Sequence, residues 1–413
     1  MTHHIFKIIW NERKINIWIL VELILVFCII WFCVDYTYFY MKRYFEPKGF
    51  NIDHVYNINL GMKQYEEEPN YEETLDDFWT IIDRINKYPG IESSCVSIAA
   101  MPYSGSYTDN MFFVDTASTS MQMKSVTSGY FDVFRFKILS GNINNWDNSS
   151  ENIGVISGNS QNSILKRPVR EIKMMSKNDK EDFKIIGTAH PTKRGDFEAY
   201  NSIIYTPFDR KDKRIVDWGG AEISIRVKPE LEKEFASKFS KNMQEQLSQG
   251  LYYLSSVTSM NKQRDNYVKN WGYDNSFKSI LSISAFLLLN IFLAVVGTFW
   301  FRIQARRGEI GLRIALGSTR TKIKSLFIVE TLTLLFLASI IATFVTINIS
   351  VTDLLQGIGV PSINREKNPI EISQYFADYG FTLLILGIIS IIAIWYPASK
   401  AAKTQPAAAL KDE

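Results

Sequence analysis

The chain has 413 residues, of which 46% are hydrophobic, and its formal net charge is only +3. A charge this small excludes the strongly basic surface of a nucleic-acid-binding protein, so we expect no nucleic-acid partner. Three cysteines and four histidines are too few and too scattered for a disulfide framework or a metal centre, so we expect neither.

Apolar residues gather in four runs, each near the length that crosses a hydrocarbon core about 30 Å thick. They predict an α-helical transmembrane bundle with four spans, at residues 16–40, 276–301, 325–350 and 376–397. The mean hydropathy of the chain is nevertheless close to zero, because the long segment 41–275 between the first two spans is polar. The expected fold class is therefore a membrane protein with a large α+β extracytoplasmic domain inserted between spans 1 and 2.

Residues 1–15 combine an apolar face with basic side chains. The apolar face comprises Ile5, Ile8 and Ile9, and the basic residues are Lys7, Arg13 and Lys14. This pattern predicts a short cytoplasmic amphipathic helix that lies along the membrane surface, with a disordered leader as the alternative. Bulky residues follow the first apolar run, so we expect a retained anchor; a cleaved signal peptide is the other interpretation.

The segment 41–275 shows the same order of elements near its start and near its end. Periodicity predicts a strand at 56–60, a helix at 71–87 and a strand at 91–99, and then a strand at 223–227, a helix at 230–248 and a strand at 251–257. Because the two strand–helix–strand units match, we expect one discontinuous α+β subdomain built from residues 50–99 and 220–260. Short strands and turn residues between them predict an inserted β-rich subdomain at 100–219.

Lysine and arginine in the short loops predict the orientation of the chain. The loop 302–324 contains many basic residues against the single acid Glu309, whereas acids balance the basic residues in the loop 351–375. The tail 398–413 is basic, like the segment before the first span. We therefore expect a multi-pass protein of the inner (cytoplasmic) membrane, with both termini and the loop 302–324 in the cytoplasm. The large domain and the short loop 351–375 would then be periplasmic.

The basic loop carries the most specific motif of the chain. From Arg306 to Ser318 it reads RRGEIGLRIALGS, which resembles RTREIGIRRALGA, the signature of the MacB/FtsX-like ABC permease family. In that family a glutamate follows early in the third span, as Glu330 does here. The resemblance implies that 302–324 is a cytoplasmic coupling loop whose helix contacts a separate ATPase. The residues implied in ATPase coupling are Arg306, Arg307, Glu309, Ile310, Gly311, Arg313, Ala315, Leu316 and Gly317.

Two further stretches resemble the same family. The end of the chain, from Pro397 to Lys411, is similar to the closing P-A-x-x-A-x-x-x-x-P-x-x-A-L-R pattern, with Lys411 in place of arginine. Residues 126–142 resemble a stretch of the family's periplasmic core domain. The matches cover essentially the whole chain in the family's order, which implies a MacB-type periplasmic core domain joined to an FtsX-like transmembrane domain.

The residue types in the coupling loop agree with a docking role. Gly311 and Gly317 would let a short helix turn tightly at the membrane surface, and Ile310, Ile314 and Leu316 would give it an apolar face. Such a helix fits a groove on a partner protein. The alternative is a surface helix whose arginines only hold lipid phosphates.

Glu22 and Glu330 are acids inside the predicted spans. A buried acid near the membrane centre costs about 2.5–3.5 kcal/mol on insertion scales, so it usually has a function. Both residues lie within about two turns of the cytoplasmic end of their apolar run, where they can reach the interface or pair with loop arginines. We favour this structural role for both, and for Glu22 a role in dimer contact or signalling is the alternative.

The sequence contains no phosphate-binding loop of the form GxxxxGK[ST] and no catalytic string such as GxSxG or HExxH. We therefore expect a non-catalytic subunit without catalytic residues or a cofactor of its own. Residues 1–15 are too few to hold an ATPase module ahead of the first span. The ATPase, which uses ATP and Mg, is accordingly expected to be a partner chain.

The resemblance also implies a mechanism and further partners. Two permease subunits, identical or different, would pair. ATP binding would press the coupling helices together, and the spans would act as stiff levers. They would move the outer domains and so push a substrate outward. A periplasmic adaptor, an outer-membrane channel and membrane lipid are candidate partners. Two alternatives stay open: an FtsX-like regulator of a cell-wall hydrolase with no transported substrate, and a lipoprotein-extracting permease.

Overall fold

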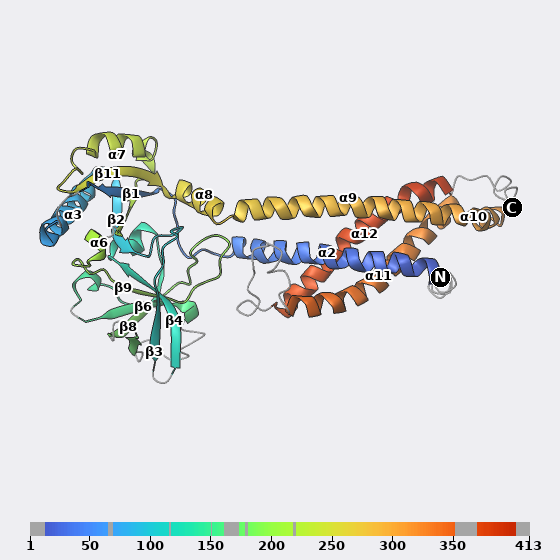
Figure 1. The fold of residues 1–413 in the computed structure, drawn as a ribbon, viewed down its shortest axis with the longest axis horizontal. Helices are drawn as coiled ribbons and strands as arrows, with labels where there is room; N and C mark the ends of the chain where they lie inside the picture. Colours follow the sequence, from blue (N-terminus) through green and yellow to red (C-terminus); the bar gives the residue numbers. More distant parts are fainter. Residues whose placement is uncertain are drawn as a thin grey trace. The chain divides into compact units, whose positions relative to one another are not determined.

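The computed structural model describes residues 13–64, 69–114, 117–149, 151–160, 173–177, 181–217, 220–351 and 370–401. The chain divides into two compact units (Figure 1). The helical unit comprises Met1–Lys42 and Asp274–Glu413, and the globular unit comprises Arg43–Tyr273. Residues 1–12 of the amphipathic helix predicted at 1–15, most of the loop 351–375 and most of the tail 398–413 lie outside the described residues, and α2 already begins at Arg13.

Four long helices and one short helix make up the described part of the helical unit (Figure 1). They are α2 (Arg13–Phe45), α9 (Tyr273–Ala305), α10 (Arg307–Ala315), α11 (Arg320–Val351) and α12 (Ile372–Ala401). Each long helix contains a segment that is long and apolar enough to cross a membrane. These segments are Asn16–Phe45, Tyr273–Ala305, Arg320–Ile349 and Ile372–Lys400. The four predicted spans thus coincide with four helices of suitable length and composition.

The helices extend beyond the predicted apolar runs. α11 begins at Arg320 instead of 325, because the Thr319 hydroxyl accepts a hydrogen bond from the Lys322 amide (3.3 Å) and caps the helix. α2 continues to Phe45, past its predicted end at 40 and across the boundary between the two units, which follows Lys42. The first connection between the units is therefore a continuous helix.

Apolar packing holds the helical unit together. Its buried core takes side chains from all four long helices, among them Phe27, Trp31, Phe299, Phe327 and Ile394. Fully buried small residues let the neighbouring helices α11 and α12 approach closely. They are Ala338, Ala342, Ala393 and Ala398. Large apolar side chains such as Phe344 are exposed on the outer faces, where hydrocarbon would cover them.

One half of the globular unit is a small antiparallel sheet covered by two helices. Its strands, in the order β11-β1-β10-β2, are Tyr252–Ser259, Val55–Met62, Glu222–Val227 and Ile91–Ile98. The helices α3 (Tyr71–Asn86) and α7 (Phe235–Met243) pack on it through a shared core that contains Phe78, Ile225 and Phe239. The strands of the two predicted strand–helix–strand units therefore alternate in one sheet.

The helix of the second unit is shorter than predicted. The periodicity indicated residues 230–248, whereas α7 begins at Phe235 and ends at Met243. A 3-10 turn (η4, Pro229–Leu231) precedes it, and Glu234 has a φ of 63°, in the left-handed region that a helix cannot contain. Of the apolar face predicted for this helix, Phe235, Phe239, Met243 and Leu247 are buried, but Leu231 lies in the 3-10 turn and is 49% exposed.

The other strands form a closed ring, called here the strand ring. They are β4 (Ala117–Val126), β3 (Asp109–Val114), β7 (Lys173–Ser176), β8 (Asp182–Ala189), β6 (Ile153–Ser157) and β9 (Ile203–Pro207). Pairing runs in that order and returns to β4 through a parallel contact of β4 with β9. Phe112, Met174 and Phe183 belong to its core. β5 (Ile138–Gly141) pairs with β8 beside the ring.

The strand ring is not a separate sheet. β4 pairs with β3 up to Gln122 and with β2 from Ser125, so one long strand serves both halves of the globular unit. The β-rich content predicted for 100–219 is present, but hydrogen bonds join this segment to the α+β half. The remaining elements are α4 (Gly129–Val133), η1 (Trp146–Asn148), α5 (Gly158–Ser160), α6 (Arg214–Asp217) and α8 (Met260–Asn270).

Candidate coupling site

A short helix lies where the signature motif predicted one. α10 follows α9 and ends in a Schellman motif, in which the Gly317 amide donates to the Ile314 carbonyl (3.0 Å) and the Ser318 amide to the Arg313 carbonyl (2.9 Å). Gly317 has a φ of +89°, which explains why a glycine stands there. The expectation for Gly311 was wrong: it lies inside α10 and is buried, so it makes no turn.

The apolar residues of α10 are divided between two opposite faces. Ile310 is buried, and Ile314 packs beside it against the core of the helical unit. Leu312 and Leu316, two residues further along, are 52% and 78% exposed. Residues two apart lie on nearly opposite sides of a helix, because each advances about 100°. The single apolar face predicted from Ile310, Ile314 and Leu316 is therefore corrected: only Leu316 of the three is available to a partner, together with Leu312.

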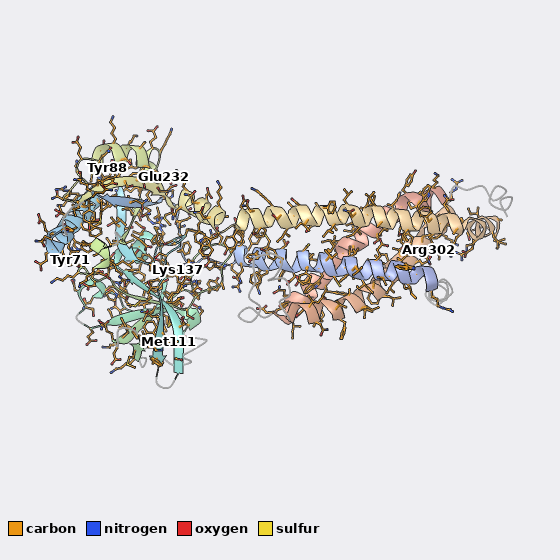
Figure 2. The ribbon with its side chains drawn as sticks, viewed as in Figure 1. Tyr71, Tyr88, Met111, Lys137, Glu232 and Arg302 are labelled. Carbon is orange, nitrogen blue, oxygen red and sulfur yellow. The ribbon has the colours of Figure 1, made fainter. Side chains whose placement is uncertain are left out.

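A ladder of alternating charges fastens α10 to its two neighbouring helices. Glu330 of α11 receives one hydrogen bond from Arg302 of α9 (2.5 Å) and another from Arg306 (3.1 Å). Glu309 of α10 receives hydrogen bonds from Arg306 (2.8 Å) and from Arg313 (2.5 Å). We call these five residues the charge ladder; Figure 2 labels Arg302, near the end of α9. Its order is Arg302, Glu330, Arg306, Glu309 and Arg313.

Three members of the charge ladder are buried and the other two, Glu309 and Arg313, are partly exposed. Glu330 is only 1% exposed, and Arg302 and Arg306 are buried with it, whereas the Glu309 side chain is 39% exposed. Arg306 also lies over the Phe327 ring, with 5.5 Å between the guanidinium carbon and the ring centroid. A carboxylate in an apolar interior is tolerated when cations satisfy both of its oxygens. Glu330 therefore joins α9, α10 and α11 into one rigid corner.

The pairing of Glu330 with loop arginines agrees with the structural role favoured from the sequence. The other predicted acid, Glu22, is half-buried in α2. The side chain of Arg307 lies outside the described residues, and the remaining predicted coupling residue, Ala315, is exposed at the end of α10.

Further buried acids in the helical unit were missed by the sequence analysis. Asp35 of α2 is buried and accepts a hydrogen bond from the Gln374 side chain of α12 (2.8 Å). Asp378, one turn further along α12, is fully buried. An acid inside an apolar run was the available signal, as it was for Glu22 and Glu330.

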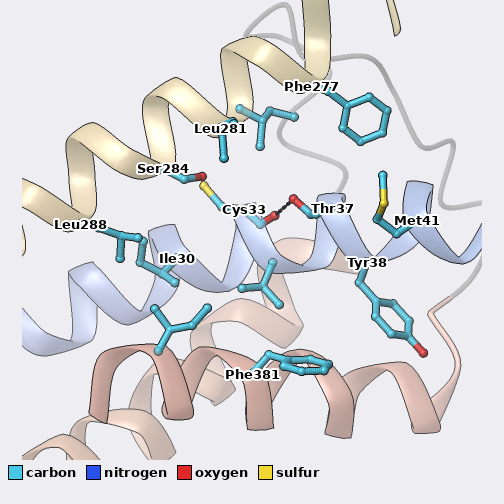
Figure 3. A pocket seen from close by; sticks show the side chains of 13 residues that line it. Ile30, Cys33, Thr37, Tyr38, Met41, Phe277, Leu281, Ser284, Leu288 and Phe381 are labelled. Carbon is cyan, nitrogen blue, oxygen red and sulfur yellow. Dashed lines mark hydrogen bonds between the residues drawn. The ribbon is translucent and has the colours of Figure 1, made fainter. Parts of the chain in front are cut away.

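An apolar cavity of about 510 Å³ lies between α2, α9 and α12 of the helical unit (Figure 3). Ile30, Val34, Leu281, Leu288, Phe381 and Ile385 are among its lining residues. The Thr37 hydroxyl, also on its wall, donates to the Cys33 carbonyl of its own helix (2.7 Å), which removes a polar group from the lining. The cavity therefore suits hydrocarbon. Among the described residues no cluster of histidine, cysteine, aspartate and glutamate could hold a metal ion.

Residues 126–142, the stretch similar to the family's periplasmic core domain, form part of the core of the globular unit. Tyr130, Phe131 and Phe134 are buried, and Phe131 meets the Trp146 ring edge-on at a centroid distance of 5.3 Å. A glycine is needed at position 129, because a Cβ there would clash with the Ser94 carbonyl oxygen at 2.1 Å. This stretch is therefore explained by packing.

The matched family agrees with the motif of the coupling site. Residues 281–406 match the FtsX-like permease C-terminal domain. This C-terminal part of the chain is thus similar to the FtsX-like permease family. The match includes α10, the charge ladder and three of the four candidate spans. The geometry of the corner and the family motif thus coincide on the same residues.

Two curated relatives and one solved structure are similar to this chain. It is 22% identical to the ABC transporter permease YtrF of Bacillus subtilis, over 56% of this chain and 52% of YtrF. It is 28% identical to the lipoprotein-releasing system transmembrane protein LolC of Haemophilus influenzae, over 33% of this chain and 34% of LolC. The match thus spans about half of one curated relative and a third of the other. The extracellular domain of the ABC-type transporter YknZ matches at 14% identity and a TM-score of 0.32, over 48% of this chain and 100% of that domain.

Proposed function

We propose that this chain is the permease subunit of an ABC transporter of the MacB-like mechanotransmission type. A separate ATPase would bind α10, and movement of α10 would pass directly into α9 and α11. The charge ladder carries this proposal, because it fastens a helix with an exposed apolar face to two candidate spans at once. A helix held only by its loops would turn on its own axis when pushed.

In this proposal the helical unit spans the inner membrane, with both termini and the coupling loop in the cytoplasm. The basic residues of that loop support the orientation. The globular unit would be periplasmic and would change conformation to push a substrate outward. Two permease subunits would pair, ATP and Mg would be used by the ATPase, and a periplasmic adaptor and an outer-membrane channel are candidate partners.

A second candidate is a permease that extracts lipoproteins from the membrane. The similarity to LolC, a transmembrane protein of a lipoprotein-releasing system, favours it. The cavity between α2, α9 and α12 has the apolar lining that an acyl chain needs. The same transfer of force from α10 serves both candidates, so they differ in the substrate and not in the coupling.

The exposed apolar face of α10 gives the direct test. The Leu316→Ser variant should lose at least about tenfold in affinity for the ATPase, because an exposed apolar anchor is removed from the docking face. We would measure recovery of an ABC ATPase with the tagged full-length chain from gently solubilised, cross-linked membranes. Leu139→Ser, which alters an exposed leucine of the globular unit, is the matched control.

Recovery of an ATPase with the wild type and the control, but not with Leu316→Ser, would support the proposal. Equal recovery with all three variants would refute docking on α10, and no ATPase with any of them would refute the proposed function. An adaptor or outer-membrane channel among the recovered proteins would favour export, and lipoproteins would favour the second candidate.

A further inference from the structure

The loop between β8 and β9 has an unusual composition for its position. Residues 191–200 have no regular secondary structure and contain four charged side chains, yet Lys193 and Asp196 are buried. Most loops run over the surface, because buried backbone and charged groups need partners. The charged partners of these two side chains come from the two ends of the globular unit, and the Tyr103 hydroxyl also donates to Asp196 (2.9 Å).

The first set of contacts reaches the segment that enters the globular unit. The Lys193 side chain donates to the Arg43 carbonyl at the end of α2 and pairs with the Glu46 carboxylate (3.1 Å). The Lys193 amide donates to the Lys48 carbonyl (3.0 Å). Gly49 has a φ of +83°, and a Cβ there would lie 2.3 Å from the Pro191 carbonyl oxygen, so the two segments touch backbone to backbone.

The second set of contacts reaches α8, through which the chain leaves the globular unit. The Arg264 side chain donates to the Asp196 carboxylate (2.5 Å), and the Tyr267 hydroxyl donates to Glu198. A Cβ on Gly195 would lie 2.7 Å from a ring carbon of Tyr267, so the loop and α8 are also in close contact.

Two side chains of the loop contact both connecting segments at the same time. Asp196 pairs with Lys48 (2.7 Å) on the entering segment and with Arg264 on the leaving one. The Phe197 ring lies 5.4 Å from the Tyr44 ring and 5.0 Å from the Tyr273 ring, between centroids. The loop therefore links the two positions at which the chain crosses the boundary of the unit.

We propose that the 191–200 loop is a transmission joint, in which Asp196 and Phe197 hold both connections to the helical unit on a single element of the globular unit. This inference rests on the proposed function for the origin of the force. Asp196 and Phe197 are positioning residues, because they act through the segments that they hold.

The location of the joint indicates which strands of the globular unit a displacement would reach. The entering segment leads into β1, and α8 follows β11, so both already belong to the antiparallel half of the globular unit. The loop connects β8 to β9, which belong to the strand ring. Displacement of either connection would therefore reach both halves together, and the strand ring would move with the antiparallel sheet.

The Lys48→Met variant tests the joint without removing a fully buried group. Lys48 contacts Asp196 but is part of the entering segment, so a shared joint predicts an effect on the other connection. We expect amide hydrogen exchange in residues 260–270 of the full-length chain in lipid nanodiscs to accelerate at least about tenfold, together with exchange in 43–50. Lys63→Met is the matched control, because Lys63 donates to the Gly250 carbonyl (2.9 Å) elsewhere in the same unit.

An effect of Lys48→Met confined to residues 43–50, with α8 unchanged, would overturn the inference. So would equal acceleration in the Lys63→Met control, since this would indicate general loosening of the unit. Phe197→Leu, which keeps an apolar side chain but shortens its reach to the two tyrosine rings, gives a second variant with the same expected pattern.

Addition of the cognate ATPase and ATP separates failure of the joint from failure of the proposed function. If ATP changes exchange in the globular unit of the wild type, and this change is lost in Lys48→Met while ATPase binding persists, the joint transmits the force. If ATP acts equally on both proteins, the joint is refuted and the proposed function stands. If ATP changes neither, the proposed function itself fails, whereas the coupled exchange of the two segments still tests the joint.

Discussion

Glu330 in the helical unit and Asp196 in the globular unit solve the same physical problem in different surroundings. Each is a buried carboxylate that holds two cationic side chains from separate segments of the chain. The cations of Glu330, Arg302 and Arg306, are themselves buried. Those of Asp196 are partly exposed, with 29% of the Lys48 side chain and 28% of the Arg264 side chain accessible.

The difference in exposure of the cations indicates the role for which each cluster is suited. Around Glu330, water cannot replace a lost partner, so the corner of α9, α10 and α11 stays fixed or the fold fails. Around Asp196, water can reach the cations, so the cluster can loosen and form again at a modest cost. We interpret the first as a rigid corner and the second as a joint.

The Glu330→Gln variant should show the largest effect. It leaves two buried guanidinium groups without their carboxylate, which typically costs about 3–5 kcal/mol. We would measure the free energy of unfolding of the full-length chain in mixed micelles. Glu309→Gln is the internal control, because its carboxylate is 39% exposed and should contribute only about 0–1 kcal/mol. Similar losses in the two variants would remove the distinction between the buried and exposed ends of the charge ladder.

Asp196→Asn should have a smaller effect, about 1–3 kcal/mol, since its cations can be hydrated. Burial alone would raise the pKa of Asp196, but hydrogen bonds from Lys48 and Arg264 outweigh it and lower the pKa below its usual value. The stabilisation that the Asp196 carboxylate contributes is therefore present above the pKa that it has in the unfolded chain. It is lost as the pH falls through the pKa that it has in the folded chain. Urea unfolding of the globular unit in nanodiscs should lose this acid-sensitive contribution in the variant. A loss as large as that of Glu330→Gln would contradict the comparison.

Replacement of Lys124 should give the smallest change in stability, and this change should be a stabilisation. Lys124 is buried in the globular unit, and its ammonium lies 3.5 Å from the Ala100 carbonyl oxygen. Burial lowers its pKa from the usual value to about 8, although Glu222 partly opposes this. Between about pH 8 and 10 the unfolded chain holds more protons than the folded one, so the stability of the globular unit should rise with pH.

Lys124→Met should remove this rise and stabilise the globular unit at pH 7 by about 1–2 kcal/mol, because an apolar side chain replaces a poorly satisfied buried charge. The same urea titration, repeated from pH 7 to 10, measures both effects. Destabilisation at pH 7 would show that Lys124 is held by its surroundings as firmly as the cations of Asp196.

Local patterns were sufficient to predict the elements and the coupling helix. The spans, the helix at 71–87 and the position of α10 depend on neighbouring residues, so periodicity and a short motif reveal them. The motif did not reveal which side of α10 is buried, because that depends on packing of Ile310 against other helices. The partners of Glu330 were predictable only as loop arginines in general, since three helices determine which ones come within reach.

Long-range pairing accounts for what the sequence analysis missed. Closure of the strand ring depends on the parallel contact of Gln122 with Ile203, which no turn or spacing specifies. The residues around Asp196 come from three distant segments. The local sequence around each charged residue predicts only a solvent-exposed side chain. A loop rich in charged residues would ordinarily be assigned to the surface, and here its burial follows from contacts with both ends of the unit.

Closure of the strand ring also bears on aggregation. Each described ring strand has a neighbour on both sides, so the ring presents no row of unpaired amides and carbonyls to another chain. An open sheet with the same strands would have two such rows, at which misfolded copies could add by strand exchange. The ring should therefore resist aggregation in a crowded compartment. A peptide partner could not add a strand to the ring and would have to bind through side chains on its surface.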